Sequence, residues 1–266
     1  MNALTDLGNR LVIGHRGNAA HAPENTLESF DQAIALGADA LELDVRVSRD
    51  GVPVVIHDPT LLRTAGRRDA VAALTAAELA SVDTGATFTR DGGATFPYRD
   101  RGLTVPTLAE VLTRFPKTPL LIEVKVPEAA APLERALVAS GAAGRTVAAS
   151  LLHDAVGPLR GRSLATGASA LDVVRLLPSA LIGRAPSQLP YEALCIPRWY
   201  YGLPLPVAKL ARAGRRAGTV THVWTIDDPR IAKRLWSAGI QGIVTNDPAV
   251  MLRARAELRV RAELQD

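Results

Sequence analysis

The sequence predicts an α/β protein folded as a (β/α)8 TIM barrel, with an insertion after the second barrel strand. Short apolar, β-branched runs alternate with Ala- and Leu-rich helical stretches almost from end to end. Eight such alternations fit into roughly 250 residues, a usual length for this barrel. One long interruption, at about 59–106, breaks the alternation early. An open doubly wound sheet would show the same periodicity, which alone does not separate the two layouts.

Eight short apolar runs are the predicted barrel strands, and helical segments lie between most of them. The strands are expected at residues 10–14, 40–45, 119–124, 145–150, 163–168, 192–197, 219–226 and 241–246. The first helix is predicted to be capped by Asn25, with Glu28 at its third position and Leu27, Phe30 and Ile34 on one face. Further helices are expected at about 107–115, 128–140, 205–217, 228–238 and 247–261.

The segment 46–57 holds an extra strand with no helix before it. Because "SRDG" is a hairpin turn signal, residues 52–57 are predicted to run antiparallel to 42–48. Pairing Ser48 with Val52 then puts Asp44 opposite Ile56, next to His57. The insertion at 59–106 is interpreted as a lid or small subdomain at one barrel end. No shift in composition marks a second domain, and residues 1–266 are therefore expected to form a single domain.

The composition argues against several classes of protein. No apolar run has the length of a membrane-spanning helix, and the N-terminus lacks a secretory pattern, which predicts a cytoplasmic protein without stable membrane insertion. The single Cys195 excludes an internal disulfide and a thiolate zinc cage, and is expected to be a small buried residue. The net charge is only +4, and the basic C-terminal stretch lacks interleaved aromatics, so no nucleic-acid partner is expected. Nothing in the composition indicates an oligomeric state.

Two carboxylates occur in a segment that otherwise looks like a buried strand. Glu42 and Asp44 share one face, because strand side chains alternate with period two, while the flanking Leu41, Leu43 and Val45 share the other. Two ionised carboxylates so close repel one another, and burying them is costly unless they are paired or coordinated. A divalent cation would neutralise them, and oxygen ligands favour Mg²⁺ or Ca²⁺ over zinc.

Other polar residues follow the carboxyl ends of predicted strands, where barrels and open α/β sheets carry their chemistry. His15 and Arg16 end the first strand, and Glu123 and Lys125 share a face at the end of the third. Together with His57, this inventory suits phosphoryl transfer. Basic side chains and a cation stabilise charge on nonbridging oxygens, while one histidine activates the nucleophile and the other protonates the leaving oxygen.

The ordered motifs resemble the glycerophosphodiester phosphodiesterase family. They are "HRG", "PENT" five residues later, "ALELDV", "DGVPVVIHDPTLLRT", "VPTLAEVL", "IEVK", "VWTIDD" and "GIVTNDP", spanning about residues 11–249. The resemblance implies hydrolysis of glycerophosphodiesters to glycerol 3-phosphate and an alcohol, through a cyclic phosphate or by direct attack of water. It also implies the following roles: Glu42, Asp44 and Glu123 as ligands of one divalent cation, His15 and His57 as the acid–base pair, Arg16 and Lys125 on the phosphate, and Trp224 in the pocket wall.

Several features leave alternatives open. The segment 145–218 is the least family-like, with Leu151 where an aromatic residue is usual. The aromatic cluster "RWYYG", residues 198–202, is either a packed loop or a platform for a leaving group such as choline. An exposed rim containing Phe88, Phe96 and Tyr98 would favour a lysophospholipase D-like activity, and a non-catalytic phosphate-ligand binding barrel is the other alternative. His21, His153 and His222 are interpreted as loop, surface and core-strand residues respectively.

Overall fold

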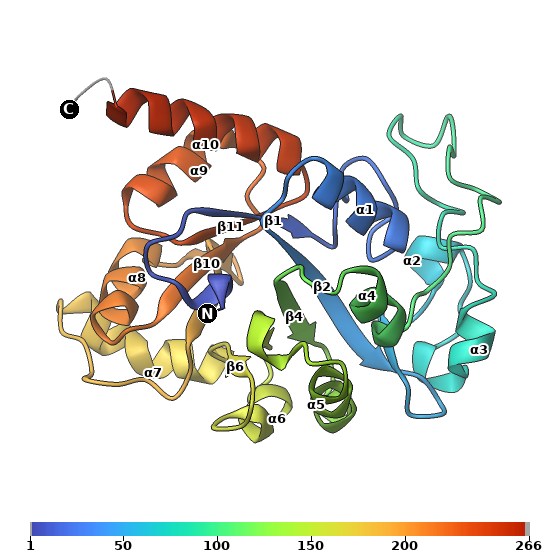
Figure 1. The fold of residues 1–266 in the computed structure, drawn as a ribbon, viewed down its shortest axis with the longest axis horizontal. Coiled ribbons are helices and arrows are strands. Elements are labelled where there is room, and N and C mark those ends of the chain that lie inside the picture. Colours follow the sequence, from blue (N-terminus) through green and yellow to red (C-terminus); the bar gives the residue numbers. More distant parts are fainter. Residues whose placement is uncertain (1, 264–266) are drawn as a thin grey trace.

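The computed structural model describes residues 2–263, and its centre is a nearly closed barrel of eight parallel strands. Around the barrel the strands follow the order β6-β5-β4-β2-β1-β11-β10-β7 (Figure 1). Between β6 and β7 the ring is bridged by Gly167 and Ala193, beside a bond of 2.8 Å from the Ala168 N–H to the Ala193 carbonyl. All eight predicted strands are confirmed, with these bounds: β1 Leu11–His15, β2 Ala40–Val47, β4 Leu120–Val124, β5 Thr146–Ala149, β6 Ala165–Thr166, β7 Ala193–Pro197, β10 Val220–Trp224 and β11 Gly242–Thr245.

Helices surround this barrel, and most lie where the sequence predicts them. Their bounds are α1 Leu27–Ala35, α2 Leu62–Ala65, α3 Ala76–Leu79, α4 Leu108–Arg114, α5 Ala130–Ala139, α6 His153–Val156, α7 Ala170–Leu181, α8 Val207–Arg216, α9 Pro229–Ser237 and α10 Pro248–Glu263. Short 3₁₀ turns are η1 Ala3–Thr5, η2 Val71–Ala73, η3 Pro127–Ala129, η4 Ala143–Arg145 and η5 Gly157–Leu159. Helix α7 has no counterpart in the prediction, because Pro178 inside it resembles a helix stop. None of the helices within residues 2–263 has the length and apolar character needed to cross a bilayer.

The predicted cap of the first helix is wrong by one residue. Thr26 is the N-cap, and its hydroxyl accepts a hydrogen bond from the Ser29 N–H at 3.2 Å. Asn25 instead adopts a left-handed backbone with φ of 57°. Its side-chain amide donates to the Asp44 carboxylate at 2.8 Å, so the asparagine belongs to the carboxylate cluster rather than to the helix end.

The predicted hairpin is confirmed in its register. Strand β3, Pro53–Val55, runs antiparallel to the end of β2 and pairs Val45 with Val55. The Ser48 N–H donates to the Val52 carbonyl, and the Ile56 N–H donates to the Asp44 carbonyl, both at 3.0 Å. Residues 59–106 follow this hairpin and pack a small apolar cluster against it, made of Val54, Ile56, Leu61, Val71, Leu79, Val82 and Val105.

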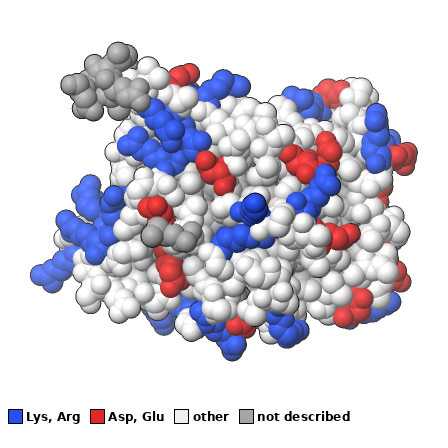
Figure 2. All heavy atoms as spheres, viewed as in Figure 1, with Lys and Arg blue, Asp and Glu red and all other residues white. Residues whose placement is uncertain are grey.

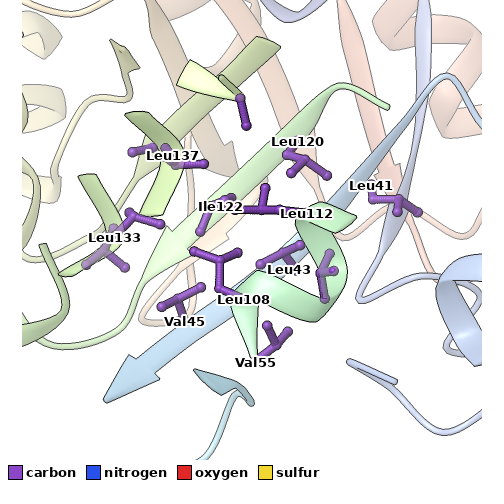
Figure 3. Packing of buried hydrophobic residues seen from close by; sticks show 14 of the residues in the cluster. Leu41, Leu43, Val45, Val55, Leu108, Leu112, Leu120, Ile122, Leu133 and Leu137 are labelled. Carbon is purple, nitrogen blue, oxygen red and sulfur yellow. The ribbon is translucent and has the colours of Figure 1, made fainter. Parts of the chain in front are cut away.

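Strict alternation along the barrel strands sends apolar side chains outward to the helices. In β2 and β4, Leu41, Leu43, Leu120 and Ile122 are fully buried against side chains of α4 and α5 (Figure 3). Each such leucine or isoleucine contributes about 1.5–3 kcal/mol by leaving water. The residues between them, Glu42 among these, point into the barrel because successive strand side chains face opposite sides.

The barrel interior is apolar at the amino-terminal end of the strands and polar at the other end. Inward-facing residues near that amino-terminal end include Ile13, Ala40, Val147 and Val220, all fully buried. The 3₁₀ turn η1 closes this end, since Leu4 packs into the same cluster and is fully buried. Only the carboxyl-terminal end is therefore left for a polar site.

Candidate active site

A pocket opens at the carboxyl-terminal end of the barrel strands. Every residue that the sequence predicts for the site except Asp44 lines it, and Asp44 lies directly beneath, fully buried. The complete lining is His15, Arg16, Glu42, His57, Leu121, Glu123, Lys125, Ala149, Ser150, Leu151, Cys195, Trp224, Thr225 and Val244. One part of the wall is thus charged and another is apolar, an arrangement suited to a ligand with a charged group and a less polar substituent.

Three carboxylates converge at the floor of this pocket. Glu42 and Asp44 come from β2 and Glu123 from β4, and one oxygen from each lies within 4.8 Å of the others. Strands β2 and β4 are paired with Asp44 beside Glu123, so the sheet register itself brings the groups together. The Asp44 Oδ1 atom is buried without a hydrogen-bond partner in the described structure, although the Lys125 ammonium lies 3.3 Å away. An all-oxygen donor set with an unsatisfied buried oxygen fits a hard divalent cation.

Burial and the neighbouring charges shift the pKa values of the two β2 carboxyls in opposite directions. Burial, together with the charge of Asp44, raises the pKa of Glu42 well above its ordinary value. Burial would also raise the pKa of Asp44, but Arg16 and Lys125 outweigh it and hold that pKa below the ordinary value. A cation bound between the two groups would favour the ionised form of both carboxyls.

His15 is held by a chain of polar side chains from two other strand ends. Its Nδ1 lies 2.7 Å from the Asn246 side-chain oxygen, and the Asn246 amide donates to Asp227 at 2.8 Å. An asparagine whose nitrogen is committed to a carboxylate offers only its oxygen to His15, so Nδ1 carries the proton. The free Nε2 therefore faces the pocket, 3.9 Å from a Glu42 oxygen. Burial and the neighbouring Arg16 lower the pKa of this imidazole.

His57 is paired with a carboxylate, whereas His15 is paired with an amide. Its Nδ1 lies 2.6 Å from an Asp58 oxygen, and its backbone carbonyl accepts a bond of 2.7 Å from the Arg46 guanidinium. Arg63, at 2.7 Å, holds the second oxygen of Asp58. Burial alone would raise the pKa of Asp58, but the hydrogen bonds from Arg63 and His57 lower it to about 2. Asp58 is thus ionised near neutral pH and favours a protonated Nδ1.

Arg16 is anchored so that it borders the carboxylates and the pocket together. Its backbone is left-handed, with φ of 49°, and its N–H donates to Glu42 at 2.9 Å. Its guanidinium lies 3.0 Å from Asp44 and 2.8 Å from Glu24. Gly17 follows with φ of 91°, where a Cβ atom would lie 2.4 Å from the Ser29 hydroxyl. Only glycine fits there, which accounts for the "HRG" sequence.

Arg63 connects the two sides of the site. It comes from α2, within the segment 59–106, and binds Glu24 through two bonds of 2.6 and 2.8 Å in addition to Asp58. A continuous series of ion pairs thus runs from His57 through Asp58, Arg63 and Glu24 to Arg16. The positions of both pocket edges therefore depend on one arginine of the insertion.

The residues that support the site are not among those predicted for it. Glu24, Asn25, Asp58, Arg63, Asp227 and Asn246 belong to the motifs "PENT", "HDPTLLRT", "TIDD" and "TNDP". Their membership in those motifs is a signal, but their partners lie up to 231 residues away in sequence. Strand-end position alone does not identify such pairs.

The other hypotheses drawn from the sequence have mixed outcomes in the geometry. None of residues 198–202 lines the pocket, and Trp199 is 56% exposed. Phe88 and Tyr98 stack edge to face within the insertion, and Arg99 covers Phe96, so these rings pack locally. His222 is a fully buried strand residue as expected, and Cys195 is buried within the barrel.

The barrel and the residues gathered at its carboxyl-terminal end define a class, a TIM-barrel hydrolase. The family model of the glycerophosphoryl diester phosphodiesterase family matches residues 15–250. A glycerophosphodiester phosphodiesterase from Caldanaerobacter subterraneus subsp. tengcongensis is 29% identical over 249 residues, covering 91% of this chain and 96% of the relative. The chain belongs to the glycerophosphoryl diester phosphodiesterase family, and the protein is a phosphoric diester hydrolase of that family.

Solved structures agree in fold. A glycerophosphodiester phosphodiesterase from Agrobacterium tumefaciens superposes with a TM-score of 0.71 at 26% identity, covering 91% of this chain and 98% of that one. A phosphodiesterase from Oleispira antarctica was solved with the product sn-glycerol-3-phosphate. It superposes with a TM-score of 0.75 at 23% identity, and the match covers 96% of this chain and 100% of that one. The second likeness concerns the barrel fold alone.

Proposed function

We propose that this enzyme hydrolyses glycerophosphodiesters to glycerol 3-phosphate and an alcohol in a reaction that depends on one divalent cation. The observation that carries the proposal is the meeting of three carboxylate oxygens within 4.8 Å at the floor of a pocket lined by two imidazoles. Family membership supplies the substrate class, and the product bound to the Oleispira antarctica phosphodiesterase is consistent with it.

Glu42, Asp44 and Glu123 would hold the cation, which we take to be Mg²⁺ or Ca²⁺ because all three donors are oxygens. When bound, the cation supplies positive charge that stabilises the phosphate oxygens in the transition state. Arg16 and Lys125 border the same pocket and add two fixed positive charges beside that position. Trp224 lies in the pocket wall and would contact the less polar part of the substrate.

The two histidines are proposed as the acid–base pair, with different tasks. His15 presents an unprotonated Nε2, because its Nδ1–H donates a hydrogen bond to the Asn246 oxygen, and it is suited to accept a proton from the attacking hydroxyl. The Asp58 carboxylate accepts a hydrogen bond from Nδ1 of His57 and so orients this pocket-lining ring, and His57 is proposed to protonate the leaving oxygen. The Nδ1 partner of His15 is a neutral amide and that of His57 is a carboxylate, and this difference is the basis for assigning the two rings different tasks.

The test is a substrate panel with the purified enzyme. Glycerophosphocholine, glycerophosphoethanolamine, glycerophosphoglycerol and lysophosphatidylcholine are each incubated with Mg²⁺, with Ca²⁺ and with EDTA. We expect glycerol 3-phosphate from the glycerophosphodiesters, loss of the activity with EDTA, and recovery on adding the cation. Activity that persists in EDTA after dialysis would contradict the proposed cation dependence. Preferential cleavage of lysophosphatidylcholine would favour the lysophospholipase D-like alternative instead.

A further inference from the structure

Helix α7 has an unusual apolar face on its outer side. Its inner face buries Asp172, Leu176 and Ala180 against the barrel. On the opposite side, Leu171, Val174, Pro178 and Leu181 are exposed at helical spacing, and Ile182 follows them. The exposed fraction of Val174 is 62% and that of Ile182 is 68%. A barrel helix ordinarily presents polar residues to solvent, and α7 therefore has a second apolar face that the described residues leave uncovered.

The hairpin that directly precedes α8 carries further exposed apolar residues at the active end of the barrel. Strand β8, Trp199–Tyr200, pairs with β9, Leu203–Pro204, directly after β7. Trp199, Tyr201 and Leu203 are all exposed. The hairpin begins beside the pocket wall, since Pro197 at the end of β7 pairs with Trp224. Of the twelve exposed large apolar residues within the described chain, seven lie between Leu171 and Leu203.

The same sector of the barrel is strongly basic. Residues 173–226 contain seven Lys and Arg and a single acid, Glu192, a net of +6 in a chain whose total is +4. The Glu192 carboxylate accepts a hydrogen bond from the Thr166 N–H. One hollow is lined by both cationic and apolar residues of α7, of the loop after α7 and of α8. They are Leu181, Ile182, Arg184, Lys209, Arg212 and Arg216. No ion pair within residues 2–263 involves these four cations. Figure 2 shows the Lys and Arg side chains gathered at the left edge, beside α8.

We propose that this surface docks reversibly on an anionic lipid bilayer. We call it the α7–α8 face and define it by Leu171, Val174, Leu181, Ile182, Arg184, Trp199, Tyr201, Leu203, Lys209, Arg212 and Arg216. Exposed Trp, Tyr and Leu side chains partition into the boundary between lipid headgroups and acyl chains. Arginine and lysine beside them bind the phosphates of anionic lipids, each contributing favourably at the surface.

Two other occupants fit the surface less well. A second copy of the chain would bring the same unpaired cations together across a twofold axis, because a symmetric dimer uses one surface twice. A nucleic acid would satisfy the cations but would leave the α7 stripe without an apolar partner, since phosphate backbones offer none. A bilayer with anionic headgroups satisfies both kinds of side chain at once.

Docking through this face goes beyond the hydrolysis proposed above. The face runs along the side of the barrel, from the hairpin beside the pocket wall to the basic hollow where α7 and α8 end, so a docked enzyme would hold the hairpin side of its pocket at the lipid surface. A glycerophosphodiester is a glycerophospholipid without its acyl chains, and a reaction that removes those chains releases this substrate at a bilayer. The face would therefore keep the enzyme where its substrate is produced.

The test measures binding of the full chain to vesicles by sedimentation, without substrate, and hence separately from hydrolysis. Vesicles of phosphatidylcholine are compared with vesicles that contain about one third phosphatidylglycerol. We expect the protein to sediment with the anionic vesicles at low salt, to remain in solution with the neutral ones, and to be released near 0.5 M NaCl, where screening shortens the reach of charge to a few ångström. Absence of binding to the anionic vesicles would refute the proposal.

Matched variants locate the binding surface. R184Q/R212Q should lower the partition coefficient roughly 25-fold, about fivefold for each neutralised arginine, and V174S/I182S should weaken binding at constant charge. The controls K117Q/R135Q and L36S/V138S alter other exposed residues outside this face and should bind as the unchanged chain does. All four variants should hydrolyse a water-soluble substrate normally, because none of these residues lines the pocket.

Three further results would overturn the proposal. Equal binding by the face variants and their controls would place the lipid contact elsewhere. A lipid-free dimer in sedimentation velocity that V174S/I182S abolishes would assign the face to a second copy. Tighter binding to duplex DNA than to anionic vesicles, lost in R184Q/R212Q, would assign it to nucleic acid.

Discussion

The two ends of the barrel each hold an inward-facing histidine, with opposite surroundings. His222 on β10 is fully buried among apolar side chains, and its Nε2 lies 2.8 Å from the Leu4 carbonyl of the closing turn η1. His15 on β1 has an amide on one nitrogen and a carboxylate cluster facing the other. Both point inward because strand side chains alternate. The two histidines therefore share an inward position in the barrel, and the groups around each ring decide whether it packs or is placed for the proposed proton transfer.

Removing a carboxylate at the polar end should have the largest effect. We expect Glu42→Gln or Glu123→Gln to lower kcat/KM by on the order of a thousandfold or more, because a site of three oxygen donors loses charge where the proposed cation would bind. Isothermal titration with Mg²⁺ and Ca²⁺ should show weakened binding in parallel. Glu128→Gln, an exposed acid close to the same strand end, is the control and should behave normally.

The histidine comparison can be tested directly. His15→Ala and His57→Ala should each lower kcat by roughly 10²–10⁴-fold with little change in KM, since proton transfer is needed mainly in the transition state. His222→Gln should keep kcat in the fraction that remains folded, because its ring does not line the pocket and its Nε2 bonds the closing turn η1. A loss of turnover in His222→Gln equal to that of His15→Ala would erase the proposed distinction between the two ends.

The support of His15 predicts a smaller, reversible effect. Asn246→Ala should lower kcat about 10–100-fold, the usual cost of losing a residue that orients a functional side chain. The exchange D227N/N246D keeps a donor–acceptor pair between the two positions and an oxygen facing His15 Nδ1, so it should recover much of the activity. Imidazole ¹⁵N shifts should report the proton on Nδ1 of His15 in the unchanged and exchanged proteins. Failure of the exchange while Asn246→Asp alone is fully active would contradict this positioning role.

A substitution at the closed end of the barrel should change the free energy of unfolding and have little effect on kcat. Burial lowers the pKa of His222 from 6.5 to about 4. Between these values the unfolded chain binds a proton that the folded chain does not, so stability is fully present above pH 6.5 and falls as pH drops toward 4. His222→Gln should remove this part of the slope, measured as the difference in urea midpoint between about pH 4.5 and about pH 7. An unchanged slope would mean that His222 titrates normally.

A structural feature could be predicted from the sequence when the residues that determine it lie close together along the chain. The positions of the strands and the shared face of Glu42 and Asp44 follow from local alternation, and the "SRDG" turn predicts the register that the structure confirms. Helix α7 escapes prediction because Pro178 resembles a stop, although Ser169 and Asp172 form a capping box at its start. The role of Asn25 is predicted wrongly because its partner, Asp44, lies on another element.

The second layer of the site cannot be predicted for a related reason. Asn246 and His15 are 231 residues apart, and Arg63 reaches Glu24 across 39 residues. Such pairs exist only once the barrel has brought strand ends together, and nothing in local composition distinguishes them from surface polar residues. The closing turn η1 depends likewise on a contact between Leu4 and His222, which are 218 residues apart.

The β2–β3 hairpin has a consequence for any attempt to redesign this enzyme. A shift of β2 by one residue would turn Leu43 and Val45 toward the pocket and bury Glu42 and Asp44 among the helices. Stability and cation binding therefore depend on the same alignment of strands. A designer who inserts a single residue within β2 would risk both properties together, whereas an insertion of two residues would preserve the alternation.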